Sequence, residues 1–300
     1  MIPIKDTNPT RNFPYLTIII IILNVYVFIL QSTLGATAQE FFFFNHGVLP
    51  RCFIASFGSE ENYRNSVEET KNMLKKSLAT NLALQQRMRI SRSQINSIDE
   101  LVNENFHRKV FGIGGMFAEI ISLFSSMFIH GGIMHLIGNM WFLWIFGNNI
   151  EDSLGVVKYL IFYLLCGIFA AFGHILFSLN SIIPTIGASG AISGVLGAYI
   201  LIYPHARILT FIPIGWFLWM EDLPAYVFLG YWIVIQILFA AFSNPFIKSS
   251  GGVAWIAHIA GFFAGVLLVI LLKGRSKDIY GQEESESVIE LFDEDEDDRF

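Results

Sequence analysis

Six apolar runs constrain the fold of this chain more than any other feature of its sequence. A helix that spans a bilayer needs about 20 mostly apolar residues, and helices satisfy their own backbone hydrogen bonds in lipid. With 54% hydrophobic and 15% charged residues, the chain is too apolar for an ordinary soluble domain of its length. We therefore predict an all-α integral membrane protein with six transmembrane helices. The runs are 14–32, 133–147, 157–178, 189–203, 225–242 and 253–272.

Both ends of the chain are predicted to lie in the cytoplasm. The amino-terminal segment, 1–13, carries Lys5 and Arg11, and basic residues also follow the last apolar run, which fits the positive-inside rule. The carboxyl-terminal segment, 273–300, is strongly acidic and cannot bury enough apolar surface to order itself, so we expect a disordered cytoplasmic tail. No Arg-rich transit peptide is recognisable, which makes a bacterial plasma membrane the expected location.

The segment between the first two runs, 33–124, is expected to be a long polar extracytoplasmic loop. Apolar residues recur in it near helical spacing among charged ones, which predicts a solvated amphipathic helix. These residues are Val67, Leu74, Leu78 and Leu82. The remainder, 125–272, holds the other five helices. Within it, Phe211–Met220 is apolar but too short to cross a membrane, and it fits an interfacial or partly re-entrant segment.

The composition excludes several classes of protein. The formal net charge of −6 comes entirely from the acidic carboxyl-terminal segment, while acidic and basic residues nearly balance in the rest of the chain and form no basic stripe, so we predict no nucleic-acid partner. Cys52 and Cys166 lie far apart, and they do not indicate a disulfide scaffold. A His-Glu-x-x-His pattern is missing and no carboxylate accompanies the histidines, so neither a metal nor a cofactor is expected. The lipid bilayer is an expected partner, whereas the oligomeric state is not indicated.

Ser189 is the first candidate functional residue. It stands in Gly187-Ala188-Ser189-Gly190, which opens the fourth run. That run lasts about 15 residues, or roughly 22 Å of helix, and cannot cross about 30 Å of hydrocarbon. Ser189 must therefore lie below the membrane surface, where a helix amino terminus offers free N–H groups to an anionic oxygen. Gly187 could support the tight turn before it. The alternative is that these small residues only pack helices together.

His258, on the sixth run, is the candidate base. Gly261 and Gly265 lie on its face of the helix, and Ser189 and Gly197 share a face of the fourth run. Two faces of small residues can pack closely, which would bring His258 within reach of the Ser189 hydroxyl as a general base. Neither helix contains Asp or Glu, so a Ser–His dyad is expected and not a charged triad.

The second run supplies candidate oxyanion contacts. His135 and Asn139 are four residues apart on one helix face, and both can donate a hydrogen bond. Together with the Ser189 backbone N–H they could stabilise an oxyanion. Hydrogen bonding between helices is the alternative role for them. His130, at the start of the same helix, is expected to support the loop and not to act directly.

These three signatures resemble the rhomboid intramembrane serine proteases in identity, order and spacing. The matching positions are His130-Gly131-Gly132, His135, Asn139, Gly187-Ala188-Ser189-Gly190, and Ala257-His258 with Gly261 and Gly265. The resemblance covers about residues 125–272 and the first helix. It implies a six-helix bundle that opens to the extracytoplasmic side and hydrolyses peptide bonds in or near transmembrane segments of other membrane proteins.

The resemblance also implies roles for individual residues. Ser189 would be the nucleophile, His258 the base, and His135, Asn139 and the Ser189 backbone the oxyanion contacts. Glu151 matches a structural glutamate of the family. The fifth run, 225–242, would form the movable side of the path by which substrates reach the site.

One departure from the family leaves the orientation of His258 open. Many members carry a tyrosine four residues after the serine, and here that position is Ser193. The alternative function is a non-catalytic membrane protein that binds transmembrane clients. Inactive relatives tend to lose the serine or the histidine, and this chain keeps both, which favours the enzyme.

Overall fold

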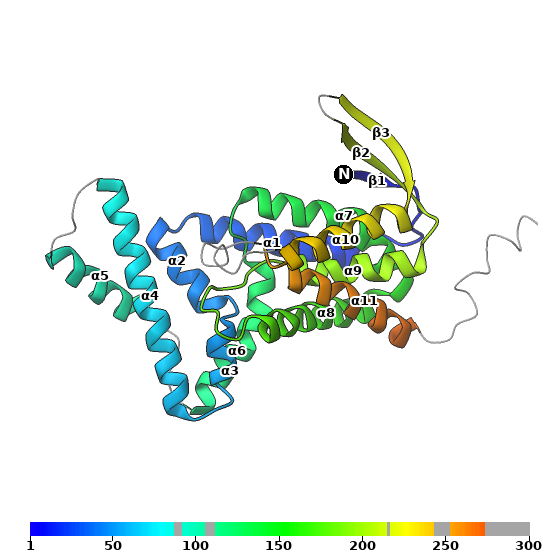
Figure 1. Ribbon diagram of the computed structural model, residues 1–300. Coiled ribbons are helices and arrows are strands. Elements are labelled where there is room, and N and C mark those ends of the chain that lie inside the picture. The colour runs from blue at the N-terminus through cyan, green and yellow to red at the C-terminus, as the bar shows by residue number, and fades with distance from the viewer. Residues whose placement is uncertain (87–91, 106–111, 215–216, 243–252, 274–300) are drawn as a thin grey trace, which may run out of the picture.

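The core of the structure is a bundle of helices that correspond to the six apolar runs (Figure 1). The structure is a computed structural model that describes residues 1–86, 92–105, 112–214, 217–242 and 253–273. The six helices are α1 (Tyr15–Ser32), α7 (Ile133–Leu154), α8 (Val156–Phe177), α9 (Ser189–Ile202), α10 (Ala225–Phe242) and α11 (Trp255–Lys273). The shortest helix, α9, lies at the centre, and every residue from 190 to 199 is buried. The acidic segment predicted to be disordered lies outside the described residues, apart from Lys273.

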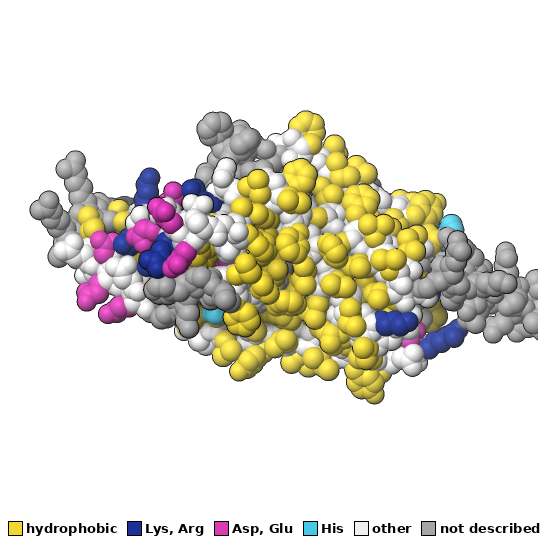
Figure 2. Space-filling model, turned by 90° about the horizontal axis from the view of Figure 1, so that it is seen from below, with side chains coloured by type: hydrophobic (Ala, Val, Ile, Leu, Met, Phe, Trp, Pro, Cys, Tyr) yellow, Lys and Arg dark blue, Asp and Glu magenta, His cyan; other side chains and the backbone are white. Residues whose placement is uncertain are grey.

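The helical membrane fold predicted from the sequence is confirmed, but a count of six complete spans is not. By length and hydropathy α1, α8, α10 and α11 can each cross a membrane. A fifth span is counted if residues 115–128 and α7 form one span that is bent by 82°. With 14 residues, α9 is about 21 Å long at 1.5 Å per residue, too short to cross. Hydrophobic side chains cover the middle of the face shown in Figure 2, as a lipid-exposed surface requires.

Residues 33–124 fold mainly into helices. A helical appendage consists of α2 (Ala36–His46), α3 (Pro50–Ala55), α4 (Glu60–Gln86) and α5 (Arg92–Asn105), and it extends from one end of the bundle (Figure 1). It is followed by α6 (Gly112–Ser125) and the short 3-10 helix η1 (Ser126–Phe128). The amphipathic helix predicted from the sequence is α4. Its Val67, Leu74 and Leu78 are buried, whereas Leu82 is half-buried.

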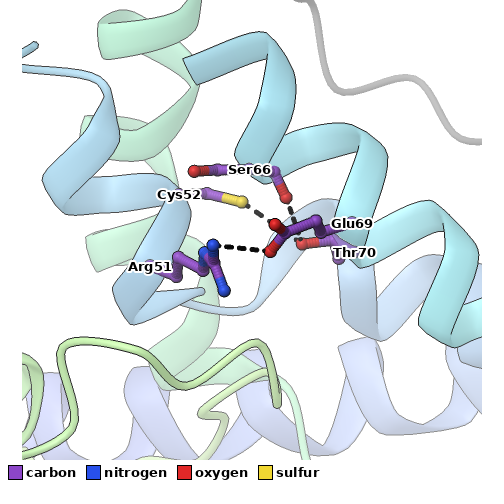
Figure 3. A network of polar contacts seen from close by, with 5 residues as sticks. All are labelled: Arg51, Cys52, Ser66, Glu69 and Thr70. Atoms are coloured by element: carbon purple, nitrogen blue, oxygen red, sulfur yellow. Dashed lines mark hydrogen bonds and ion pairs between the residues drawn. The ribbon is translucent and has the colours of Figure 1, made fainter. Parts of the chain in front are cut away.

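The appendage has an apolar core and a polar contact of its own. The core side chains are Phe41, Leu49, Cys52, Tyr63, Val67, Leu74, Leu78 and Val102. Arg51 on α3 forms an ion pair with Glu69 on α4 at 2.6 Å, and the Cys52 thiol lies 3.5 Å from the Thr70 hydroxyl (Figure 3). The Thr70 hydroxyl donates to the Ser66 carbonyl. These contacts fix α3 against α4, so the polar segment is a folded unit.

A small antiparallel sheet lies at the opposite end of the bundle (Figure 1). Its strands are β1 (Ile2–Asp6), β2 (Arg207–Ile214) and β3 (Phe217–Pro224), in the order β1-β2-β3. The segment Phe211–Met220, expected to be interfacial or partly re-entrant, belongs mainly to the two paired strands β2 and β3. The physical reason is that the amino-terminal segment supplies a third strand, in which Ile2 lies opposite Phe211.

Polar contacts attach β1 to the bundle. The Asp6 carboxylate accepts hydrogen bonds from the Tyr199 hydroxyl at 2.7 Å and from the Asn149 amide at 2.6 Å. The Trp141 indole N–H donates to the Pro3 carbonyl at 2.6 Å. Tyr199 stands near the carboxyl end of α9, so the sheet is tied to the same helix that begins with Ser189.

Glu151 holds the first helix against α7. Its buried carboxylate accepts the backbone N–H groups of Leu16 and Thr17 at 2.8 and 2.7 Å, and also the Thr17 hydroxyl at 2.7 Å. These N–H groups belong to the first turn of α1, where backbone N–H groups have no acceptor within the helix. A negative charge there also interacts favourably with the helix dipole. This contact agrees with the structural role that the family resemblance implies for Glu151.

Glycines allow α9 and α11 to pack backbone to backbone. A Cβ added at Gly197 would overlap the Phe262 carbonyl, and one added at Gly261 would overlap the Gly190 carbonyl. A Cβ at Gly265 would overlap the backbone of Gly194. The close approach of these two faces, predicted from the spacing of small residues, is therefore confirmed.

We expect Gly265→Ala to force α9 and α11 apart, since the new methyl group meets backbone that cannot rotate away. Overpacking of this kind costs about 1–3 kcal/mol. The matched control is Gly230→Ala on α10, where an added Cβ meets nothing within 4 Å. Thermal unfolding in detergent micelles should show a lower midpoint for Gly265→Ala and an unchanged or higher one for Gly230→Ala. Equal midpoints for the two variants would contradict the packing described here.

Asp6 should make the stability of the fold depend on pH. Burial raises the pKa of the Asp6 carboxyl above its ordinary value, although the hydrogen bonds from Tyr199 and Asn149 partly offset this. The native state therefore holds the Asp6 proton to a higher pH than the unfolded state does. Stability should fall as pH rises from the ordinary pKa through the raised one, and then level off. Unfolding midpoints between about pH 4 and pH 8 should show this fall in the wild type and lose it in Asp6→Asn; the same slope in both proteins would refute the assignment.

Candidate functional site

Ser189 is the first residue of α9, as its sequence context predicts. The turn before it depends on Gly187, whose φ of +122° is a conformation that side chains rarely permit. The Gly187 N–H donates to the Ser126 carbonyl at 2.8 Å, and Thr185 pairs with Val48 through two backbone hydrogen bonds. These bonds tie the loop before Ser189 to η1 and to the segment between α2 and α3. Ser189 therefore faces the end of the bundle that carries the helical appendage.

The structure brings Ser189 and His258 together. The His258 Nε2 atom lies 2.9 Å from the Ser189 Oγ atom, which is hydrogen-bonding distance. His258 as a whole residue is 9% exposed, whereas Ser189 is half-buried. The serine can thus be reached from outside the bundle while the histidine is mostly enclosed. The backbone contact between α9 and α11 sets this distance.

The orientation of His258, left open by the sequence, is set by residues on α10 and α11. The His258 Nδ1 atom lies 2.7 Å from the Gln236 Oε1 atom on α10. The Trp232 ring is tilted by 34° against the imidazole with the ring centroids 6.0 Å apart, and the Trp255 ring meets it edge to face at 6.1 Å. Ser193 does not take the place of the tyrosine that many rhomboid proteases carry there, because its hydroxyl donates to the Ser189 carbonyl.

Gln236 and Trp232 were not found by sequence reasoning. A signal for Gln236 existed, since it is the only amide side chain in the apolar run 225–242. A polar side chain in a spanning helix is a candidate site residue on that ground alone. Motif spacing cannot find it, because Gln236 lies on a helix that carries none of the three signatures.

His135 and Ser189 both lie close to Gly187. A Cβ added at Gly187 would stand 2.8 Å from the His135 Nε2 atom and 3.7 Å from the Ser189 Oγ atom. The two side chains therefore border the same small space. Asn139 is buried one turn further along α7, and its amide nitrogen has no hydrogen-bond partner among the described residues.

His130 is buried and packs against His135. Its ring meets the His135 ring edge to face at 5.1 Å. Its backbone is paired with the side chain of Gln31 on α1, which donates to the His130 carbonyl and accepts the His130 N–H. This position fits the supporting role expected for His130. In the part of the chain that the structure describes, no group of three or more His, Cys, Asp or Glu residues could hold a metal ion.

Comparison with known proteins identifies the family. The model of the Rhomboid domain family matches residues 118–275, which is more than half of the chain. The chain therefore belongs to the rhomboid family and is a multi-pass membrane protein.

Three relatives illustrate the range of the family. The chain is 31% identical over 151 residues to Rhomboid protein 1, mitochondrial, of Saccharomyces cerevisiae, which covers 49% of this chain and 40% of that protein. It is 31% identical over 150 residues to RHOMBOID-like protein 6, mitochondrial, of Arabidopsis thaliana, covering 50% and 43%. It is 32% identical over 146 residues to Rhomboid protease GluP of Bacillus subtilis, covering 49% and 25%. The match thus spans less than half of each relative.

We expect Gly187→Ala to disturb the site more than a neighbouring substitution. The methyl group would meet the His135 ring at 2.8 Å, and the backbone conformation would be strained by about 1–3 kcal/mol. The control is Gly132→Ala in the adjacent loop, where φ is an extended 172° and an added Cβ meets nothing within 4 Å. Gly187→Ala should lower the unfolding midpoint and slow the reaction of Ser189 with a fluorophosphonate. If Gly132→Ala had the same effects, the assignment of a special conformational role to Gly187 would be wrong.

Proposed function

We propose that the protein is an intramembrane serine endopeptidase that cleaves transmembrane proteins with a Ser189–His258 dyad. The observation that carries this proposal is the 2.9 Å contact between Ser189 Oγ and His258 Nε2 at the amino terminus of a helix too short to span the membrane. A hydroxyl paired with an imidazole is the arrangement that activates a serine nucleophile. Family membership supports the proposal, since one relative is named as a protease.

The proposed reaction has two steps. Ser189 Oγ attacks the carbonyl carbon of the scissile peptide bond while His258 Nε2 takes the hydroxyl proton. The C–N bond then breaks, and His258 returns the proton to the leaving amine. In the second step His258 deprotonates a water molecule, which attacks the acyl carbon. The ester bond to Ser189 Oγ then breaks, and His258 returns the proton to that oxygen. The anionic oxygen formed in each step would accept hydrogen bonds from His135, Asn139 and the Ser189 N–H. Each such donor contributes about 3–4 kcal/mol in a soluble protease.

The proposed substrates are transmembrane segments that reach Ser189 from the side. The carbonyl groups of a transmembrane helix are hydrogen-bonded within the helix, so the segment must unwind before Ser189 can attack it. Small or helix-breaking residues near the cleavage point would favour this unwinding. The half-buried position of Ser189, below the end of the bundle that carries the appendage, suits attack on a segment near the membrane surface.

The proposed topology places the sheet in the cytoplasm. Lys5, Arg11 and Lys273 lie at the end of the bundle away from the appendage, and the positive-inside rule assigns that end to the cytoplasm. Residues 1–13 would then be cytoplasmic, residues 33–124 extracytoplasmic, and residues 125–272 the catalytic core. Because mitochondrial, plant and bacterial proteins are all among the relatives, the bacterial plasma membrane stays a prediction from the sequence alone.

Ser189→Ala should abolish cleavage of a reporter transmembrane substrate by the purified protein in liposomes. The substitution removes only the hydroxyl group, so the helices should still fold. A thermal unfolding measurement can verify this. Ser193→Ala is the matched control, because it removes a hydroxyl one turn along the same helix that donates to a backbone carbonyl. We expect that variant to keep most of the activity.

Labelling with a fluorophosphonate separates an enzyme from a membrane protein that only binds transmembrane clients. In an enzyme the wild type is labelled at Ser189, and His258→Ala slows the labelling strongly. Undiminished cleavage by Ser189→Ala would remove Ser189 from the mechanism. A folded wild type that binds the reporter segment but neither cleaves it nor reacts with the probe would instead be a binding protein.

A further inference from the structure

The hydrogen bond between His258 and Gln236 involves a residue that belongs to none of the three sequence signatures. Gln236 lies on α10 and is 5% exposed. Its Oε1 atom is 2.7 Å from His258 Nδ1, on the opposite side of the ring from the Nε2 atom that faces Ser189. The three side chains thus form a continuous line from α10 through α11 to α9.

The chemistry of this line determines which nitrogen of His258 carries the proton. An amide oxygen can only accept a hydrogen bond, so the bond to Gln236 requires a proton on Nδ1. In the neutral ring the Nε2 atom then has a free lone pair. That lone pair points at the Ser189 hydroxyl, as a general base requires. The other tautomer would carry its proton on Nε2 and could not take one from Ser189.

The aromatic side chains that pack against His258 supply no acceptor for its Nδ1–H group. The indoles of Trp232 and Trp255 pack against the imidazole, but an indole N–H only donates a hydrogen bond. The Ser193 hydroxyl is engaged by the Ser189 carbonyl. The rings of the tryptophans can hold the plane of the imidazole, whereas Gln236 supplies the acceptor.

We propose that Gln236 is a positioning residue that holds His258 in the tautomer and orientation needed to take the proton of Ser189. This inference rests on the proposed function, because it concerns the same proton transfer. When Nε2 takes the proton from Ser189, the Nδ1–H bond to Gln236 remains, so the imidazolium keeps its orientation until the leaving amine accepts the proton. Gln236 thereby takes the structural position of the third member of a triad without carrying a charge.

The experiment compares three substitutions of Gln236 in the full-length protein in liposomes. Gln236→Leu removes the acceptor. Gln236→Asn keeps the amide but shortens the side chain by one methylene group, which withdraws it from Nδ1. Gln236→Glu keeps an acceptor oxygen at the same reach. The control is Val234→Leu, an outward-facing residue of the same helix that is 51% exposed. The measurements are kcat and KM for a reporter transmembrane substrate and the rate at which a fluorophosphonate labels Ser189.

We expect Gln236→Leu and Gln236→Asn to lower kcat and the labelling rate by about 10²-fold, the lower range of what a general base contributes. KM should stay close to that of the wild type, because the side chain acts on the base and not on substrate binding. Gln236→Glu should keep most of the wild-type kcat and labelling rate. Val234→Leu should match the wild type in every measurement.

Several results would overturn the inference. Wild-type kcat and labelling rates in Gln236→Leu would show that His258 needs no acceptor at Nδ1. A loss in Gln236→Glu as large as that in Gln236→Leu, with both proteins folded, would assign Gln236 to packing alone. If Gln236→Leu does not fold, the comparison of Gln236→Asn with Gln236→Glu carries the same two outcomes. A wild type that is neither labelled at Ser189 nor active would refute the proposed function itself, which is a different result from any of these.

Discussion

The close backbone contact between α9 and α11 is the constraint on which the rest of the structure depends. In lipid there is no hydrophobic force that drives helices together, so packing of small residues and polar contacts must hold them. Gly197, Gly261 and Gly265 let the carbonyl groups of one helix approach the backbone of the other. Any side chain larger than hydrogen at these positions would enlarge the gap. The distance between Ser189 and His258 is therefore a consequence of helix packing and not of a flexible loop.

A helix as short as α9 leaves both of its ends inside or close to the membrane, and each end is held by distant parts of the chain. At the amino end, the loop before Ser189 bonds to Ser126 and Val48. Near the carboxyl end, Tyr199 donates to Asp6 of β1. The appendage and the sheet, at opposite ends of the bundle, are thus both connected to the helix that carries the serine.

The sequence predicts those features that depend on local pattern. The six apolar runs predict the helices, the apolar spacing from Val67 to Leu78 predicts α4, and the small residues around Ser189 and His258 predict their contact. The features that it does not predict arise from pairing between remote segments. About two hundred residues separate β1 from β2, and the spacing of apolar residues along the chain cannot show that Ile2 lies opposite Phe211. Gln236 reaches His258 only through the packing of α10 on α11, which no motif encodes.

An uncharged partner for His258 suits a site inside a membrane protein. A carboxylate at the position of Gln236 could also accept the hydrogen bond from His258 Nδ1–H, but it would cost more to bury than a neutral amide, because a charge loses more hydration. Within the described residues no ion pair involves α10. An amide oxygen orients the imidazole at a much smaller desolvation cost, although it stabilises the imidazolium less than a full negative charge would. In the proposed mechanism, more of the stabilisation of the transition state must therefore come from the donors around the oxyanion. In that mechanism the amide nitrogen of the buried Asn139, which has no hydrogen-bond partner among the described residues, would be such a donor without adding a charge.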